Sequence, residues 1–97
     1  MGKLNGKVAL ITGSSRGLGK AMAIAFAAEG AAIAVGYNSS ADGAVDTVDT
    51  IRKAGGDAES FQGDITIPES VDSIVAAALE RFNRIDILVN NAGLVNA

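Results

Sequence analysis

The sequence predicts an α/β fold in which a parallel β-sheet carries helices on both of its faces. Short apolar runs alternate with segments of helical periodicity, and glycines stand at most of the junctions between them. The apolar runs are typical of parallel strands that are buried on both sides. Right-handed connections between such strands give an expected strand order of 3-2-1-4. With 97 residues and 48% hydrophobic content, the chain is expected to form a single domain, residues 1–97.

The first half of the chain is expected to form two strands and two helices. The first strand covers residues 7–11 and ends in a glycine-rich turn. Helical spacing then runs from Leu18 to Gly30, a residue type that commonly ends helices. A second strand at residues 32–36, or one residue less, leads through a polar loop into a helix that ends at residues 55–56, Gly-Gly.

The second half is expected to add a strand, a helix and a fourth strand. The third strand is weak and covers residues 58–61. The helix after it is predicted to begin with a capping box formed by Thr66 and Glu69, with Pro68 in its first turn. The fourth strand covers residues 85–89. Because doubly wound sheets commonly continue with further strands, we expect a fold truncated after this strand, whose exposed outer edge favours self-association.

The composition excludes several classes of function. The sequence has no histidine and no cysteine, so we expect no metal site, no disulfide and no thiol chemistry. The formal net charge of -3, without clustered Lys or Arg, predicts no binding of nucleic acid. No apolar run approaches the roughly 20 residues of a membrane span, and the first residues lack the apolar core of a signal peptide. We therefore expect a cytoplasmic protein that does not bind membranes.

Three glycines with the spacing Gly13-x-x-x-Gly17-x-Gly19 follow the first strand and open the first helix. In a dinucleotide-binding turn, the first glycine lets the strand turn, the second lets the backbone approach a pyrophosphate, and the third lets the helix pack closely. The N–H groups and the positive end of the helix dipole then face the phosphates. The alternative is a plain strand-to-helix turn that merely needs glycine. The position between a strand and a helix favours the dinucleotide site.

The loop after the second strand indicates which dinucleotide would bind. Folds that bind NAD usually place an acidic residue here to hold the ribose 2′-hydroxyl, but this sequence has no acid until Asp42. A 2′-phosphate would instead meet the polar side chains of Asn38, Ser39 and Ser40. The guanidinium of Arg16 would lie close to it as well. These residues favour NADP(H), with NAD(H) as the alternative. In the competing interpretation, Ser39 or Ser40 caps the next helix and Arg16 is solvated.

Two further loops follow strands at the same edge of the sheet. Asp64 follows the third strand, where its carboxylate would accept a hydrogen bond from an adenine amino group, with Ile65 against the ring. Alternatively, Asp64 is a loop carboxylate that caps the helix behind it. Residues 90–93, Asn-Asn-Ala-Gly, bring amides to the carboxyl ends of the first and fourth strands, where a ligand should lie. A turn that needs Asn and Gly would look the same.

Two motifs in order and register resemble those of the short-chain dehydrogenase/reductase family. They are residues 12–19, Thr-Gly-Ser-Ser-Arg-Gly-Leu-Gly, and residues 90–93, with Asp64 between them. The resemblance covers essentially the whole chain, but only the N-terminal half of the family's Rossmann-like fold. Within the family, the opening residues 4–13, the NADP-type loop and the Asp64-Ile65 pair are most similar to 3-oxoacyl-(acyl-carrier-protein) reductases and glucose-dehydrogenase-like members.

The resemblance implies a binding site for NADP(H), a nicotinamide dinucleotide, built from the loops that follow all four strands. Thr12 would be structural and would tie the glycine turn to residues 90–91. The implied contacts are Gly13, Ser15, Arg16, Gly17, Leu18 and Gly19 with the phosphates and ribose, Asn38 and Ser39 with the 2′-phosphate, Asp64 and Ile65 with the adenine, and Asn91, Ala92 and Gly93 with the nicotinamide-side ribose.

The resemblance also implies a proton relay, which this sequence does not supply. In the family, a Tyr donates to the substrate carbonyl, a Lys four residues later lowers the tyrosine pKa, and a Ser orients the carbonyl. The only tyrosine here, Tyr37, is followed four places on by Ala41, so no catalytic residue is predicted. We interpret the chain as the NADP(H)-binding part of a reductase whose parent reduces a carbonyl of the 3-oxoacyl type by hydride transfer. The alternatives are a stand-alone, non-catalytic nucleotide-binding or scaffold module, and a half-enzyme completed by another chain.

Overall fold

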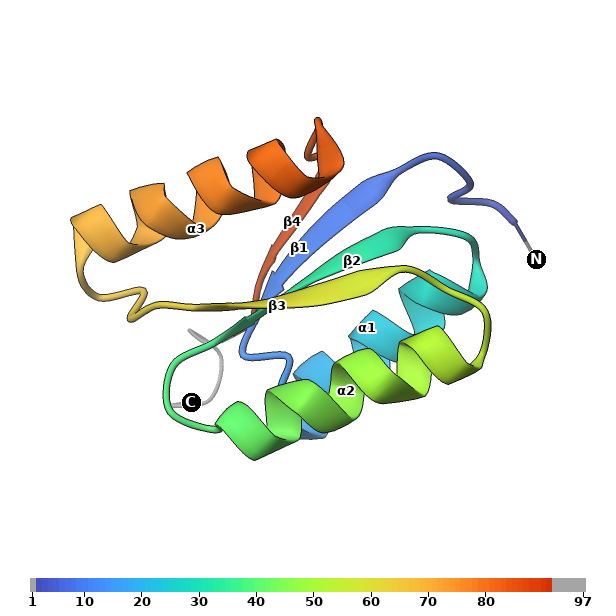
Figure 1. Cartoon of the computed structure of the whole chain (residues 1–97), viewed down its shortest axis with the longest axis horizontal. Helices are drawn as coiled ribbons and strands as arrows, with labels where there is room; N and C mark the ends of the chain where they lie inside the picture. The colour runs from blue at the N-terminus through green and yellow to red at the C-terminus, as the bar shows by residue number, and fades with distance from the viewer. Residues whose placement is uncertain (1, 92–97) are drawn as a thin grey trace.

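A computed structural model describes residues 2–91, which form a four-stranded parallel sheet with helices on both faces (Figure 1). The strand order is β3-β2-β1-β4, which confirms the predicted order. Helices α1 and α2 cover one face and α3 covers the other (Figure 1). In chain order the elements are β1 (Val8–Thr12), α1 (Gly17–Ala28), β2 (Ala32–Tyr37), α2 (Ala41–Lys53), β3 (Ala58–Gln62), α3 (Pro68–Phe82) and β4 (Ile87–Asn90).

The core lies on both sides of β1, whose five residues are all buried. Ala9 and Ile11 pack with the side chains of α1 and α2, whereas Leu10 packs with the side chains of α3. This alternation explains why the strand is apolar at every position before Thr12: neither face meets water. In the parallel register Thr12 lies beside Asn90, so the carboxyl ends of β1 and β4 are neighbours.

Strand β4 begins two residues later than predicted, at Ile87. Before it, Asp86 accepts a hydrogen bond from the Val8 N–H through its side-chain Oδ2, at 2.8 Å. The Asp86 carboxylate thus takes the place of the backbone carbonyl that would accept the Val8 N–H in a regular parallel strand pairing. Arg84 pairs with the same carboxylate, and this hydrogen-bonded ion pair holds the pKa of Asp86 below its usual value.

The predicted capping box of α3 is wrong. The helix begins at Pro68, its N-cap position is Ile67, and no side chain caps it. A residue before proline is driven into extended backbone, and Ile67 has φ −110° and ψ 112°, so the helix cannot begin at Thr66. The Thr66 hydroxyl instead donates to Asp64 Oδ1 at 2.6 Å.

Helix α1 ends as predicted, at a glycine with a left-handed backbone. Gly30 has φ +100°, and its N–H donates to the Ala27 carbonyl at 2.9 Å. The Ala31 N–H donates to the Phe26 carbonyl at 3.2 Å, which completes a Schellman motif. Helix α2 ends in the same way at Gly55, where φ is +94°. The two turns differ in their surroundings, because Gly30 lies against Asn5 whereas a Cβ at Gly55 would stand in open space.

Strand β4 lies at one edge of the sheet. Among the described strands it is hydrogen-bonded to β1 alone. Its Leu88 side chain is 66% exposed. Within residues 2–91, no helix has both the length and the apolar composition needed to cross a membrane.

The paired glycine turns give a stability prediction. Gly55→Ala should lower the free energy of unfolding by about 1–2 kcal/mol, because alanine is strained in the left-handed conformation. Gly30→Ala should lower it by about 1–3 kcal/mol more, since a Cβ there would lie 1.8 Å from Asn5 Oδ1 and 3.0 Å from Asn5 Cα. Urea unfolding of the two variants measures the difference. If the two variants lose equal amounts of unfolding free energy, Asn5 moves aside at no energetic cost and the prediction is contradicted.

Candidate functional site

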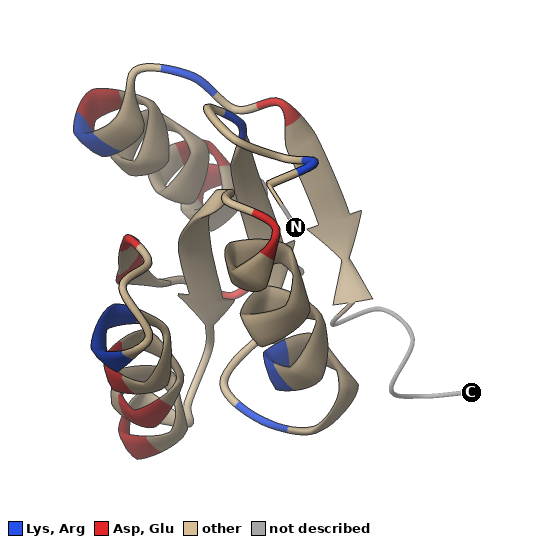
Figure 2. Cartoon of the chain, turned by 90° about the vertical axis from the view of Figure 1, so that its right-hand side faces the viewer, with Lys and Arg blue, Asp and Glu red and all other residues tan. Residues whose placement is uncertain are grey.

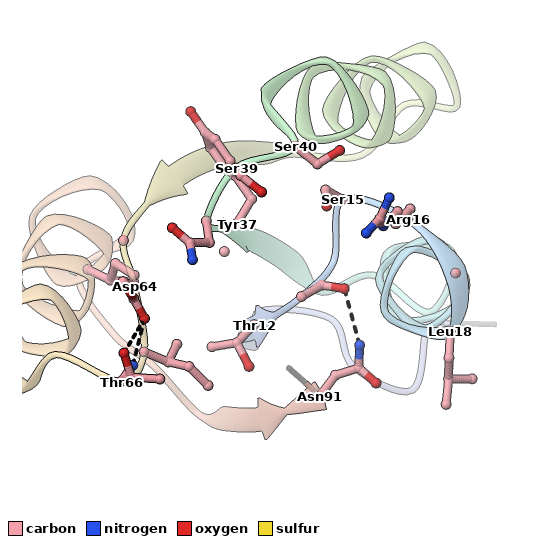
Figure 3. Close-up of a pocket in the computed structure, with 17 residues that line it drawn as sticks. Thr12, Ser15, Arg16, Leu18, Tyr37, Ser39, Ser40, Asp64, Thr66 and Asn91 are labelled. Atoms are coloured by element: carbon pink, nitrogen blue, oxygen red, sulfur yellow. Dashed lines mark hydrogen bonds between the residues drawn. The ribbon is translucent and has the colours of Figure 1, made fainter. Parts of the chain in front are cut away.

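A cleft of about 700 Å³ opens at the carboxyl ends of the strands (Figure 3). Its walls come from the loop after β1, the end of β2, the loop after β3 and Asn91 at the end of β4. Parallel α/β sheets bind ligands at this edge, where the strand order reverses. Of the predicted site residues, those that line the cleft are Gly13, Ser15, Arg16, Gly17, Leu18, Asn38, Ser39, Asp64, Ile65 and Asn91.

The loop after β1 presents bare backbone to the cleft. Gly13 and Gly17 have positive φ, +65° and +61°, which favours glycine at both positions. A Cβ on Gly17 would meet no atom within 4 Å, so the space in front of this backbone is open. Helix α1 starts at Gly17, and its first amides have no acceptor within the helix. The loop therefore offers unpaired N–H groups and a helix N-terminus to a ligand anion.

Gly19 does not line the cleft; it holds α1 against the loop. A Cβ at this position would lie 2.1 Å from the Gly13 carbonyl oxygen and 2.6 Å from Asn91 Nδ2. Asn91, which is 5% exposed, donates from that same Nδ2 to the Gly13 carbonyl oxygen at 3.1 Å (Figure 3). Any side chain on Gly19 would push these groups apart.

Thr12 ties the end of β1 to the end of β4, as the family resemblance implies. Its hydroxyl lies 3.3 Å from the Val89 carbonyl oxygen and 3.2 Å from Asn90 Oδ1. Together with the Asn91 bond, this contact fixes the loop after β4 against the glycine loop. The predicted Ala92 and Gly93 lie outside the described residues.

The end of β2 lies beside the glycine loop, where the Ser14 N–H donates to the Gly36 carbonyl oxygen at 3.1 Å. Tyr37, Ser39 and Ser40 line the cleft from this strand end and the loop after it (Figure 3). Ser40 holds the N-cap position of α2, but its side chain makes no capping hydrogen bond. Within residues 2–91, Arg16 is the only basic residue that lines the cleft.

Asp64 closes a small turn after β3. Its Oδ1 accepts hydrogen bonds from the Thr66 N–H at 2.9 Å and from the Thr66 hydroxyl at 2.6 Å (Figure 3). These two donors, the hydroxyl first, hold the pKa of Asp64 below its usual value, so the side chain is a carboxylate at neutral pH. Asp64 therefore does not cap α3, and its interpretation as a helix cap is wrong.

Sequence reasoning missed several residues that line this part of the cleft. From the sequence, Thr66 is assigned to a capping box, and Ile74, a helix residue, is not singled out. Helical periodicity places a residue on a face but does not tell whether that face ends at a core or at a cleft. The one sequence signal was the glycine at position 63, directly before Asp64. In the structure a Cβ there would lie 2.5 Å from Ile74 Cδ1, so glycine lets Ile74 approach this loop. The lining residues outside the predicted set are Thr12, Gly36, Tyr37, Gly63, Thr66 and Ile74.

Residues 7–97 match the short chain dehydrogenase family. The chain belongs to this family. Its fold also matches the N-terminal part of a solved member, a dehydrogenase/reductase from Sinorhizobium meliloti, with a TM-score of 0.88 and 40% identity. That match covers 90% of this chain and 34% of the other. Membership implies binding of a nicotinamide dinucleotide.

Curated relatives in the family carry different names at similar identity. The chain is 47% identical over 91 residues to 3beta-hydroxysteroid dehydrogenase 1 of Eggerthella lenta, covering 94% of this chain and 35% of that protein. It is 44% identical over 94 residues to a 3-oxoacyl-(acyl-carrier-protein) reductase of Synechocystis sp., covering 97% of this chain and 38% of that protein. The similarity therefore does not single out the 3-oxoacyl reductases. The chain spans little more than a third of the length of these relatives.

The turn at Asp64 gives a prediction for its titration. Thr66→Val removes one of the two donors, so the pKa of Asp64 should rise towards that of a free aspartate. Because folding lowers this pKa, the turn stabilises the fold above the unfolded pKa and loses that contribution as pH falls through the folded pKa. Carbon-13 NMR of the Asp64 carboxyl group as a function of pH measures the midpoint of its titration. Thr50→Val, on α2, is the control; an unmoved midpoint in Thr66→Val contradicts the assignment.

Proposed function

We propose that the cleft binds NADP(H) in preference to NAD(H). The observation that carries the proposal is the wall formed by Arg16, Ser39 and Ser40, together with the lack of an acidic residue among the cleft-lining part of residues 36–40. A guanidinium and hydroxyl donors suit a ribose 2′-phosphate, whereas a carboxylate would repel it. The hydroxyl of Ser40 is not used in capping α2, which supports its availability to a ligand.

The remainder of the cleft suits the other parts of the dinucleotide. The backbone of Gly13, Ser15 and Gly17 and the N-terminus of α1 would hold the pyrophosphate, with Leu18 beside it. The carboxylate of Asp64 is ionised and held by Thr66, so it is ready to accept a hydrogen bond from the adenine amino group. Ile65 would pack against the ring, and Asn91, Ala92 and Gly93 would lie by the nicotinamide-side ribose.

Bound NADPH would supply a hydride for reduction of a carbonyl, of which the 3-oxoacyl type is the class we favour for the parent enzyme. This chain's own residues bind and orient the cofactor. Its only tyrosine, Tyr37, lies in the cleft beside the proposed 2′-phosphate site and has Ala41, not a lysine, four residues later. We therefore propose that this chain alone is inactive as a reductase. A stand-alone nucleotide-binding module would also be inactive as a reductase. Reductase activity of the purified chain would therefore contradict both interpretations, the cofactor-binding part of a reductase and the stand-alone module.

Self-association through β4 is a second proposal. Figure 2 shows β4 at an outer edge of the structure, without Lys, Arg, Asp or Glu along its ribbon. An uncharged edge strand offers unpaired backbone groups to another chain. The 66% exposed Leu88 adds apolar surface beside that edge.

The role of Arg16 predicts a selective effect on cofactor affinity. Arg16→Gln should weaken NADPH binding by about tenfold, since it removes a charge-assisted contact with the 2′-phosphate. NADH, which lacks that phosphate, should bind with unchanged affinity. Parallel fluorescence titrations with both cofactors measure the ratio, and Arg52→Gln, in the last turn of α2, is the matched control. Equal loss of both affinities would contradict the assignment of Arg16.

The exposed edge predicts a change of oligomeric state. Leu88→Lys should convert the self-associated chain to a monomer, because a charge beside the edge opposes pairing of β4 with a second copy. Light scattering at several protein concentrations measures the mass. Val45→Lys is the control, since Val45 is an apolar residue on α2 that is 54% exposed. A wild-type chain that is monomeric at all concentrations would refute the self-association.

A further inference from the structure

Helix α2 contacts the glycine loop through a buried hydroxyl. Thr47 has no exposed surface, and its Oγ1 lies 3.0 Å from the Ser14 carbonyl oxygen. The same hydroxyl lies 2.9 Å from the Gly43 carbonyl oxygen, one turn earlier in the helix. The bond to Ser14 joins residues that are 33 apart in the sequence. A threonine inside a helix commonly donates to the carbonyl four residues earlier, which here is that of Gly43. The contact with the Ser14 carbonyl is an additional, tertiary one.

Ser14 is held on three sides. Its N–H donates to the Gly36 carbonyl oxygen of β2 at 3.1 Å, and its hydroxyl donates to the Ile11 carbonyl oxygen of β1 at 2.7 Å. The Thr47 hydroxyl supplies the contact from α2. Ser14 has no exposed surface, so water cannot replace a lost partner without a local opening.

Gly43 brings α2 against the next residue of the loop. A Cβ at Gly43 would lie 2.5 Å from the Ser15 carbonyl oxygen, so only glycine allows this approach. Glycine inside a helix lowers helix stability relative to alanine, and close packing is a common reason for its presence. An ion pair between Lys20 and Asp46 also joins α2 to α1, the helix that follows the glycine loop.

We propose that Thr47 is a positioning residue for the NADP(H) site. It fixes the segment from Ser14 to Arg16 against α2 and thereby sets the place of Arg16 relative to Ser39 and Ser40. These two serines directly precede α2, so one helix positions both sides of the 2′-phosphate site. The inference rests on the proposed function.

The pyrophosphate side of the loop is fixed by other contacts. Gly19 and Asn91 hold the Gly13 carbonyl and the start of α1 from the opposite direction. Loss of the Thr47 bond therefore displaces Arg16 together with Ser14 and Ser15, whereas Gly13 and the start of α1, which supply most of the pyrophosphate contacts, stay in place. The consequence is a loss of preference for NADPH over NADH.

Thr47→Val tests this role, because valine keeps the shape of threonine and removes the hydroxyl. NADPH affinity should fall by about fivefold, the effect of one neutral hydrogen bond, while NADH affinity stays within about twofold. Thr47→Ser keeps the hydroxyl and should restore NADPH affinity. Thr50→Val is the control, since Thr50 makes only the local bond to the Asp46 carbonyl, at 2.8 Å, on the same helix.

Amide hydrogen exchange tests the positioning without any cofactor. In Thr47→Val, exchange of the Ser14 amide should speed up by about tenfold, whereas the Leu10 amide in the middle of β1 should be unchanged. Gly43→Ala should produce the same local effect by pushing Ser15 away, even though alanine favours the helix.

The outcomes separate the two proposals. Failure of the wild-type chain to bind either cofactor refutes the proposed function, and exchange at Ser14 then decides whether Thr47 positions the loop. Unchanged exchange at Ser14 in Thr47→Val overturns the positioning role. Equal loss of NADPH and NADH affinity overturns its link to the 2′-phosphate, because a purely structural role would lower both.

Discussion

The close approach of α1 to the turn after β1 is the constraint on which the rest of the site depends. The approach exists because Gly19 has no side chain: a Cβ there would lie 2.1 Å from the Gly13 carbonyl oxygen. That carbonyl oxygen also accepts a hydrogen bond from the side-chain amide of Asn91, which brings the end of β4 to the same point. The N-terminus of α1 can then face the cleft with its first amides unpaired. Displacement of α1 would move the helix dipole away from the proposed phosphate site and would also separate Asn91 from its acceptor.

Around this contact, hydrogen bonds of polar side chains hold the loops at the strand ends. Thr12 contacts Val89 and Asn90, Ser14 is bonded to Ile11 and Gly36, and Asp64 closes its own turn through Thr66. Buried polar groups that are fully paired favour a single arrangement, because any other leaves a group without a partner. The cleft is thus formed before a ligand arrives, which lowers the ordering cost of binding.

The sequence predicted the parts of this structure that depend on local patterns. Apolar runs and glycine spacing were enough for the strand order and the C-terminal turns at Gly30 and Gly55. Most of the residues that line the cleft were predicted from the polar loops after the strands and from the family resemblance. The start of α3 was missed because Pro68 restricts Ile67, an effect that outweighed the capping-box pattern. The contact of Thr47 with Ser14 was missed for a different reason. It depends on how α2 lies across the sheet, which no spacing within α2 encodes, although Gly43 inside the helix was a sign of close packing.

Assembly of the four loops into one nucleotide site is most directly tested by an NMR titration of the purified chain with NADPH, following every backbone amide. The structure predicts saturable shifts in residues 13–18, 38–40 and 63–66 and at Asn91, the groups that surround the cleft. Amides at the opposite ends of the strands, such as those of Val8 and Ala58, should not move. Shifts spread evenly over the chain, or none that saturate, would contradict a preformed site at the carboxyl ends of the strands.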